Sequence, residues 1–155
     1  VDTQGLSGFA YRIQIEDTNG NLMNEVPVGK SWQVRVLFKI NTQTKHFIIA
    51  LGMSDSLEVH IRTSWSDPLD LDKGEYEAVF KEEQLLLATG MHYLTLGLSI
   101  SERPIQYLEN IASLYISDVN DHSLNKTIIR TAGVGVVLNP MIIKIALNKV
   151  QIHTS

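Results

Sequence analysis

Hydrophobic and polar side chains alternate along most of this chain with a period close to two residues. The clearest runs lie at 9–15, 32–40, 57–61, 76–80, 92–100 and 114–116. A period of two puts the apolar side chains on one face of an extended chain, so each run predicts a half-buried β-strand. Residues 46–54 are more continuously apolar, which predicts a strand in the middle of a sheet. Residues 134–138, between a glycine and a proline, predict a further strand.

Turn-forming residues separate these runs. The segment Thr18-Asn19-Gly20-Asn21 predicts a tight hairpin turn, because Asn and Gly tolerate positive φ. The short link at 54–56 predicts a second hairpin, and 66–74 and 118–126 are polar and predict loops. Tyr107 to Ile111 breaks the alternation and predicts a short helical turn.

The number and length of the runs indicate the fold class. No segment shows a helical apolar repeat over about 12 residues or more, and no repeat of about 20 to 50 residues indicates a propeller or solenoid. About eight to nine short strands separated by turns predict an all-β fold, either an antiparallel β-sandwich or a barrel. A length of 155 residues fits one domain spanning 1–155.

The C-terminal segment, 140–155, is rich in aliphatic side chains and contains two lysines and no acidic residue. It is apolar enough to need a partner strand. It forms either the last strand of its own sandwich or a strand that pairs with, or is exchanged with, another chain.

Composition and charge exclude several classes of protein. A hydrophobic content of 44% excludes an intrinsically disordered chain. The absence of cysteine excludes a disulfide scaffold, a thiolate metal site and a cysteine nucleophile. A net charge of −4 argues against a protein that binds duplex nucleic acid, which needs a basic face.

The chain carries no recognisable targeting segment. No apolar run approaches the roughly 20 residues of a membrane span. The start, Val1-Asp2-Thr3-Gln4, lacks the basic and then apolar regions of a signal peptide. Because there is no initiator methionine, we expect an excised domain or a processed chain.

Motifs for catalysis and metal binding are missing. The sequence has no G-x-S-x-G, no H-E-x-x-H and no Walker loop. Asp67, Asp70 and Asp72 precede Gly74, but their spacing differs from that of a calcium-binding EF-hand loop, so a solvated turn is the better interpretation. We therefore expect no cofactor, no metal and no enzymatic activity. A pair of carboxylates brought together from distant positions, as in glycosidases, stays open.

Aromatic residues make up only 7% of the chain, so each one outside the core is informative. Six fall in register with aliphatic neighbours and predict core positions: Phe9, Tyr11, Trp32, Phe38, Tyr76 and Phe80. Four fall out of register or in loops and are candidates for stacking on sugar rings: Trp65, Tyr93, Tyr107 and Tyr115. His60, Arg62 and Ser64 supply polar groups close to Trp65, with His60 and Arg62 expected on one strand face.

The order of turns and strands resembles a known family. Asp17-Thr18-Asn19-Gly20-Asn21 matches its D-x-x-G turn, and Val28 to Val34 matches the glycine-led entry into its second strand. Further segments match in order: 47–55, 74–80, 85–98, 108–116 and 135–140. Together they resemble the C-terminal polysaccharide-recognition domain of Wzt-type ATPases, which belong to O-antigen ABC transporters.

This resemblance implies an immunoglobulin-like antiparallel β-sandwich that recognises O-antigen polysaccharide, often at its non-reducing end. It also implies a homodimer at the cytoplasmic face of the bacterial inner membrane, with a fused ATPase domain and a membrane permease as partners. The candidate carbohydrate-binding residues are those named from the pattern: His60, Arg62, Ser64, Trp65, Tyr93, Tyr107 and Tyr115. The alternative is an immunoglobulin-like domain for protein interaction or adhesion, and a glycan hydrolase is the third hypothesis.

Overall fold

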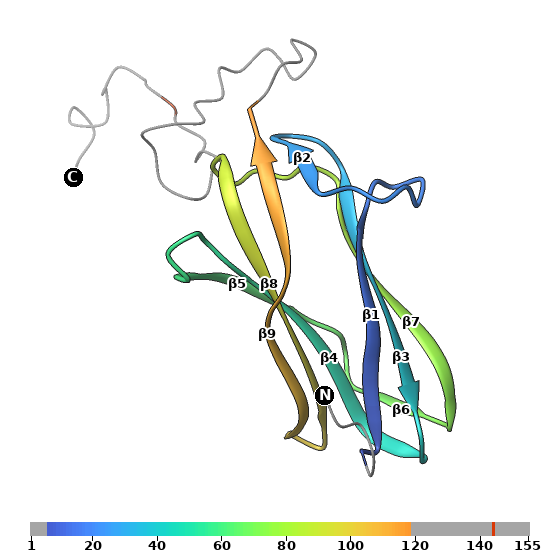
Figure 1. Cartoon of the computed structure of the whole chain (residues 1–155). Helices are drawn as coiled ribbons and strands as arrows, with labels where there is room; N and C mark the ends of the chain where they lie inside the picture. The colour runs from blue at the N-terminus through green and yellow to red at the C-terminus, as the bar shows by residue number, and fades with distance from the viewer. Residues whose placement is uncertain (1–5, 119–143, 145–155) are drawn as a thin grey trace, which may run out of the picture.

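Two β-sheets pack face to face and enclose a single hydrophobic core (Figure 1). This computed structural model describes residues 6–118 and 144. The described residues contain nine strands: β1 (Gly8–Glu16), β2 (Glu25–Pro27), β3 (Trp32–Ile40), β4 (Thr44–Ser54), β5 (His60–Trp65), β6 (Leu69–Leu71), β7 (Gly74–Glu82), β8 (Gly90–Ile100) and β9 (Arg103–Ser117). The all-β fold predicted from the alternation is confirmed, and of the two architectures left open, sandwich and barrel, the structure is the sandwich that the family resemblance implied.

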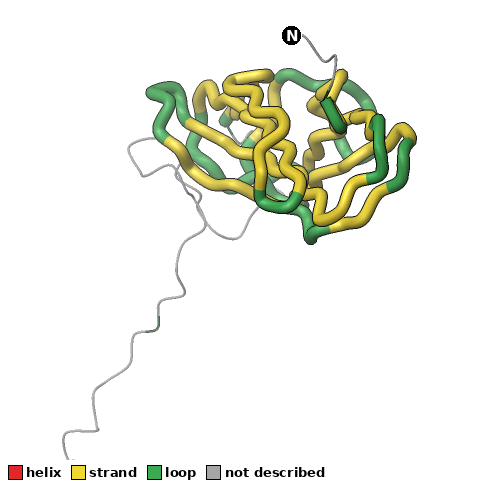
Figure 2. The backbone as a smooth tube through the Cα atoms, turned by 90° about the horizontal axis from the view of Figure 1, so that it is seen from below, coloured by secondary structure: helices red, strands yellow, loops and turns green. Residues whose placement is uncertain are grey.

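The sheets differ in size, and the larger one carries the surface of interest. The small sheet has the order β1-β3-β7, and all its pairs are antiparallel. The large sheet has the order β2-β9-β8-β4-β5, with β6 paired to β4. Its pairs are antiparallel except for β2, which runs parallel to β9. Seen end-on, the strands form two layers (Figure 2).

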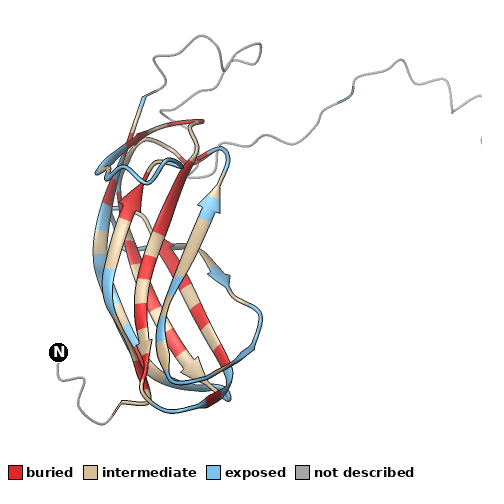
Figure 3. Cartoon of the chain, turned by 90° about the vertical axis from the view of Figure 1, so that its right-hand side faces the viewer, coloured by how far each residue is buried: buried red, intermediate tan, exposed pale blue. Residues whose placement is uncertain are grey.

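The alternation in the sequence becomes alternating burial along the strands (Figure 3). On β4, for example, Phe47, Ile49, Leu51 and Met53 are buried, whereas the residues between them face outward or are small. The ring of Phe47 stacks on Phe38 of the small sheet with ring centroids 5.1 Å apart. The inward face of each strand therefore packs against the opposite sheet, as period-two patterning requires.

The predicted turn after β1 is present, but it does not lead into a two-stranded hairpin. Asp17 Oδ1 accepts hydrogen bonds from the backbone N–H groups of Asn19 and Asn21, and Gly20 adopts a φ of 88°. After a single bridge between Glu16 and Leu22, the chain crosses to the large sheet and forms β2. The strand that pairs with β1 is therefore β3.

The helical turn predicted at Tyr107 to Ile111 is wrong, because these residues belong to β9. The pairing of β8 with β9 shifts register between Leu94 and Leu96, and Asn110 has a φ of 50°. A bulge of this kind shifts the side-chain alternation by one residue. The broken pattern therefore marked an irregular strand instead of a helix.

The strand predicted at 57–61 begins later, at His60. Leu57 and Val59 lie in the β4–β5 turn, where their backbone N–H groups donate to Asp55 Oδ1. Their side chains are exposed, so the alternation at 57–59 did not reflect a buried strand face. The predicted loop at 66–74 contains the short strand β6.

The predicted loop at 118–126 beyond residue 118, the predicted strand at 134–138 and the predicted partner strand in 140–155 lie outside the described residues, apart from Lys144. Among residues 6–118 and 144, there is no helix with the length and apolar character of a membrane span.

Candidate functional site

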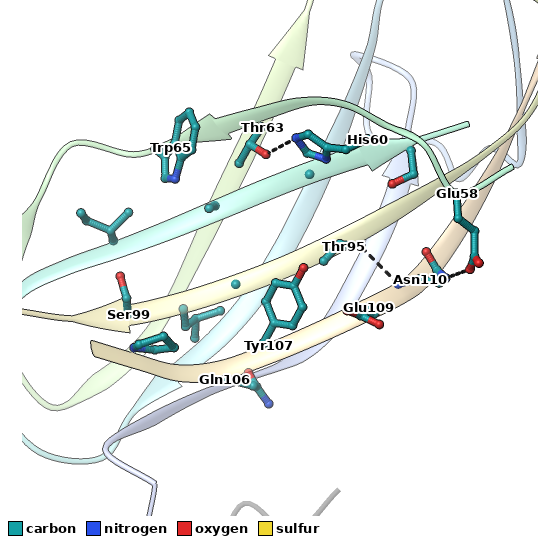
Figure 4. A pocket seen from close by; sticks show the side chains of 17 residues that line it. Glu58, His60, Thr63, Trp65, Thr95, Ser99, Gln106, Tyr107, Glu109 and Asn110 are labelled. Atoms are coloured by element: carbon teal, nitrogen blue, oxygen red, sulfur yellow. Dashed lines mark hydrogen bonds between the residues drawn. The ribbon is translucent and has the colours of Figure 1, made fainter. Parts of the chain in front are cut away.

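A groove of about 570 Å³ lies on the outer face of the large sheet (Figure 4). Strands β4, β5, β8 and β9 line it, together with the turn between β4 and β5. The inward face of these strands is occupied by the core, so the groove is built mainly from outward-facing positions, although the buried residues Leu98 and Gln106 also border it. This is the polar face of the sheet that contains β4, β5, β8 and β9.

Small residues form the floor of the groove. Ala50 and Gly52 occupy successive outward positions of β4, and Gly97 occupies the neighbouring position on β8. A Cβ added to Gly97 would lie 3.7 Å from Cδ1 of Tyr107, and one added to Gly52 would lie 3.6 Å from Cε1 of His60. The missing side chains therefore leave space that the flanking aromatic and imidazole rings border.

Two exposed aromatic rings stand at the sides of this floor. Trp65 of β5 pairs with Ala50, Ala50 pairs with Gly97, and Gly97 pairs with Tyr107 of β9. The four residues form one row across four adjacent strands, with an aromatic residue at each end and two small residues between them. The side chains of Trp65 and Tyr107 are 69% and 65% exposed. Because strands lie about 4.8 Å apart, the backbones that carry the two rings are separated by about 14 Å.

A polar row runs beside the aromatic row. Thr63 of β5 and Thr95 of β8 both pair with Gly52 of β4. Thr63 Oγ1 lies 2.8 Å from Nε2 of His60, and the backbone N–H of Asn110 donates to Thr95 Oγ1 over 3.2 Å. This row places hydroxyl, imidazole and amide groups next to the aromatic rings.

A hydrogen bond between the β4–β5 turn and β9 spans the sheet at this end of the groove. Asn110 Nδ2 donates to Glu58 Oε1 over 2.7 Å (Figure 4). Both residues have left-handed backbones, with φ of 63° at Glu58 and 50° at Asn110. Such conformations are uncommon outside glycine, and both side chains line the groove.

Sequence analysis named seven site residues, and the structure brings three of them together. His60, Trp65 and Tyr107 line the groove. Tyr93 and Tyr115 lie on the same outer face but outside it, where Tyr93 pairs with Ser113 and Tyr115 pairs with Met91. A ligand longer than the groove would reach these two tyrosines along the sheet.

Arg62 and Ser64 lie on the opposite side of β5. They pair with Met53 and Leu51, whose side chains are buried in the core, and they border a smaller hollow between the sheets. The expectation that His60 and Arg62 share a strand face is wrong. A register shift between Met53 and Ser54 inserts one residue and reverses the facing of β5 between His60 and Arg62.

Arg62 takes part in an ion pair. Its guanidinium donates to both carboxylate oxygens of Glu82 on β7, and Trp32 Nε1 donates to Glu82 Oε1 over 2.8 Å. Burial opposes ionisation of Glu82, but the hydrogen bonds from Arg62 and Trp32 outweigh it and lower the pKa of the carboxyl group. The same pair raises the pKa of Arg62. In the structure described here, Arg62 therefore connects the two sheets.

Several groove residues were not found from the sequence. Glu58, Thr63, Thr95, Glu109 and Asn110 all line it. The small residues at alternate positions of β4 and β8 were a usable signal, because glycine and alanine on an outward face leave a hollow. The positions of Glu58 and Asn110 depend on left-handed backbones, which the alternation does not reveal.

The described residues offer no site for a metal ion, since no three His, Asp or Glu side chains among them converge. The polar groups of the groove are hydroxyls, amides, one imidazole and two carboxylates. This set suits hydrogen bonding to a ligand that carries many hydroxyl groups.

Comparisons with known proteins identify the fold. No protein-family model and no curated protein matches the chain. The solved structure of the C-terminal domain of Wzt superposes with a TM-score of 0.64 at 10% sequence identity, and the match covers 73% of this chain and 75% of that one. Alkylpurine DNA glycosylase AlkC of Pseudomonas fluorescens, bound to DNA with an abasic site analogue, gives a TM-score of 0.47 at 9% identity over 72% of this chain and 31% of that one. The resemblance to the Wzt domain predicted from the order of turns and strands is confirmed at the level of fold.

Proposed function

We propose that this chain is a non-catalytic carbohydrate-recognition domain that binds O-antigen polysaccharide. The observation that carries the proposal is the row Trp65–Ala50–Gly97–Tyr107, in which two exposed rings border a floor without bulky side chains. The similarity of the fold to the C-terminal domain of Wzt supports it.

The physical basis of binding is the match between the row and a sugar ring. A pyranose has an apolar C–H face that packs on an aromatic ring, while its hydroxyl groups project sideways. In the groove, these hydroxyls would meet Thr63, Thr95 and His60 in the adjacent polar row. Because each ring is held on a strand, little conformational freedom is lost on binding.

The proposal assigns binding without bond cleavage. A glycosidase needs one carboxyl group to protonate the leaving oxygen and a second one to act as base or nucleophile. Both groove carboxylates, Glu58 and Glu109, have exposed side chains, whereas the general acid of a glycosidase lies in an apolar pocket. Incubation with a bound polysaccharide is therefore expected to release no shorter product, and release of product would replace this proposal with a hydrolase.

The likeness to Wzt supports a cellular setting that is part of the proposal. The domain would couple a polysaccharide to an ABC transporter at the cytoplasmic face of the inner membrane, next to an ATPase domain and a membrane permease. It would act as a homodimer, in which 140–155 pair or are exchanged between subunits.

The test is a calorimetric titration in which the affinity of the full chain for purified bacterial O-polysaccharides is measured. Trp65→Ala and Tyr107→Ala should each weaken binding about 5- to 150-fold, because loss of a stacked aromatic ring costs roughly 1–3 kcal/mol. Tyr11→Ala is the matched control, since Tyr11 is 49% exposed but lies on β1 of the other sheet. Equal affinities for all three variants and the wild type would overturn the assignment of the groove.

A second candidate function is an immunoglobulin-like domain for protein interaction or adhesion. The observation that favours it is the β4–β5 turn, where the side chains of Leu57 and Val59 are 81% and 57% exposed. Exposed apolar side chains that lie together often mark contacts with other proteins. A partner protein whose binding is lost in Leu57→Ser and kept in Trp65→Ala would support this candidate over the glycan.

A further inference from the structure

We propose that the groove selects its glycan by charge: it accepts uncharged or amino-bearing sugars and rejects sugars with carboxylate or phosphate groups. This inference rests on the proposed carbohydrate-binding function and names the ligand class of the same groove.

The first observation is that the charged side chains of the groove are acidic. Glu58 and Glu109 line it, and both side chains are exposed. No lysine or arginine is among the described residues that line it. Within the described part of the chain, the other titratable side chains at the groove are His60 and Tyr107. Two carboxylates therefore determine the charge that a bound sugar would meet.

The second observation is that these carboxylates have no cationic partner among the described residues. The arginines that form ion pairs in this part of the chain are Arg35, which contacts Glu16 and Glu77, and Arg62, which contacts Glu82. Both arginines form their ion pairs with carboxylates that lie outside the groove. The negative charge of Glu58 and Glu109 is therefore left for the ligand.

The hydrogen-bonding groups of the groove also favour uncharged or amino-bearing sugars. An ionised carboxylate only accepts hydrogen bonds, so it pairs with sugar hydroxyl, N-acetyl N–H or ammonium groups. Asn110 Nδ2, which would suit an acidic sugar as a donor, uses one of its two N–H groups on Glu58. Exposed aromatic rings beside carboxylates also attract ammonium groups through the faces of the rings.

The size of the effect follows from Coulomb's law. A sugar carboxylate about 6 Å from a groove carboxylate, in the solvent-exposed setting of this sheet, would lose about three- to tenfold in affinity for each repulsive pair. The effect should decrease as salt screens the charges.

The experiment compares one polymer in two charge states. A neutral O-polysaccharide that binds the full chain is oxidised at its primary hydroxyl groups to give the uronic acid form. We expect the oxidised form to bind wild type more weakly at low salt. In the Glu58→Gln/Glu109→Gln double variant, the ratio of affinities for oxidised over unoxidised polymer should rise about ten- to hundredfold. The glutamine at 58 keeps an oxygen that accepts from Asn110.

A matched control removes the same charge elsewhere. Glu75 lies on β7 of the small sheet and Glu83 follows that strand, and both are exposed and outside the groove. Glu75→Gln/Glu83→Gln should leave the ratio as in wild type. An equal rise in this control would overturn the inference, because it would show an effect of net charge alone.

The two proposals fail differently. Tightest binding of acidic polysaccharides, unchanged in the groove double variant, would overturn charge selection and leave carbohydrate recognition standing. If no polysaccharide binds, whether neutral, amino-bearing or acidic, the proposed function falls and the charge selection falls with it.

Discussion

Arg62 on β5 and Glu82 on β7 form a bidentate ion pair between the sheets. Arg62 Nη1 lies 2.5 Å from Glu82 Oε2, and Arg62 Nη2 lies 2.9 Å from Glu82 Oε1. β5 and β7 are edge strands of their respective sheets. Trp32, which is buried, donates to the same carboxylate from β3. The pair therefore joins the two layers at one open side of the sandwich, where β5 and β7 are not paired with each other.

The first prediction concerns the stability that this ion pair provides. Arg62→Ala leaves the half-buried Glu82 carboxylate without its main partner, so the free energy of unfolding should fall by about 1–2 kcal/mol. Urea unfolding measures the change. Arg12→Ala is the control, because Arg12 is exposed on β1. A loss in the control equal to that in Arg62→Ala would contradict the role of the ion pair.

The second prediction concerns pH. Because the pKa of Glu82 is lowered in the folded chain, the ion pair stabilises the fold fully above the ordinary carboxyl range. This stability is lost as the pH falls through the lowered pKa. The Glu16 pKa is also lowered, chiefly by the hydrogen bond from Arg35, and contributes in the same direction. Unfolding free energies measured from pH 7 to pH 3 should fall less steeply in Glu82→Gln than in wild type, and parallel curves would contradict this.

The third prediction concerns the floor of the groove. Gly97→Val should abolish the space beside Tyr107 and weaken glycan binding at least about tenfold, while the strand tolerates the branched residue. Ser113→Val adds the same side chain to an exposed position of β9 outside the groove and should bind as wild type does. Calorimetric titration compares the glycan affinities of the two variants at a temperature where both are folded. Normal binding by Gly97→Val would remove Gly97 from the site.

The fourth prediction concerns the hydrogen bond across the sheet. Asn110→Gly keeps the left-handed backbone and removes the whole side chain, including the amide that donates to Glu58. The relief of the Cβ in this backbone offsets part of the lost hydrogen bond, so unfolding free energy should change by less than about 0.5 kcal/mol. Asn110→Ala keeps a Cβ in the same backbone but loses the amide, and it should cost about 1 kcal/mol more than the glycine variant. Thermal unfolding compares the two. Equal stabilities would show that the backbone at 110 is not held left-handed in solution.

The sequence was informative where alternation was uninterrupted. β1, β3, β4, β7 and β8 lie close to the predicted runs, because their inward faces have to be apolar to pack on the other sheet. It was misleading at Tyr107 to Ile111 and at Arg62, where bulges change the facing of the chain by one residue. Local composition does not encode a bulge strongly, because the extra residue is accommodated by pairing with a distant strand.

In the site, too, the sequence predicted part of the arrangement and strand pairing decided the rest. Trp65 and Tyr107 were identified as unpartnered aromatics from the sequence alone, since neither fits an apolar stripe. Their meeting across Ala50 and Gly97 depends on the registers of three strand pairs. The sequence by itself determined the all-β fold and the few aromatic rings outside the apolar stripes, because the spacing of apolar side chains shows which of them are buried. Only the tertiary structure decided which polar groups join those rings, because strand register places residues from distant positions in one row.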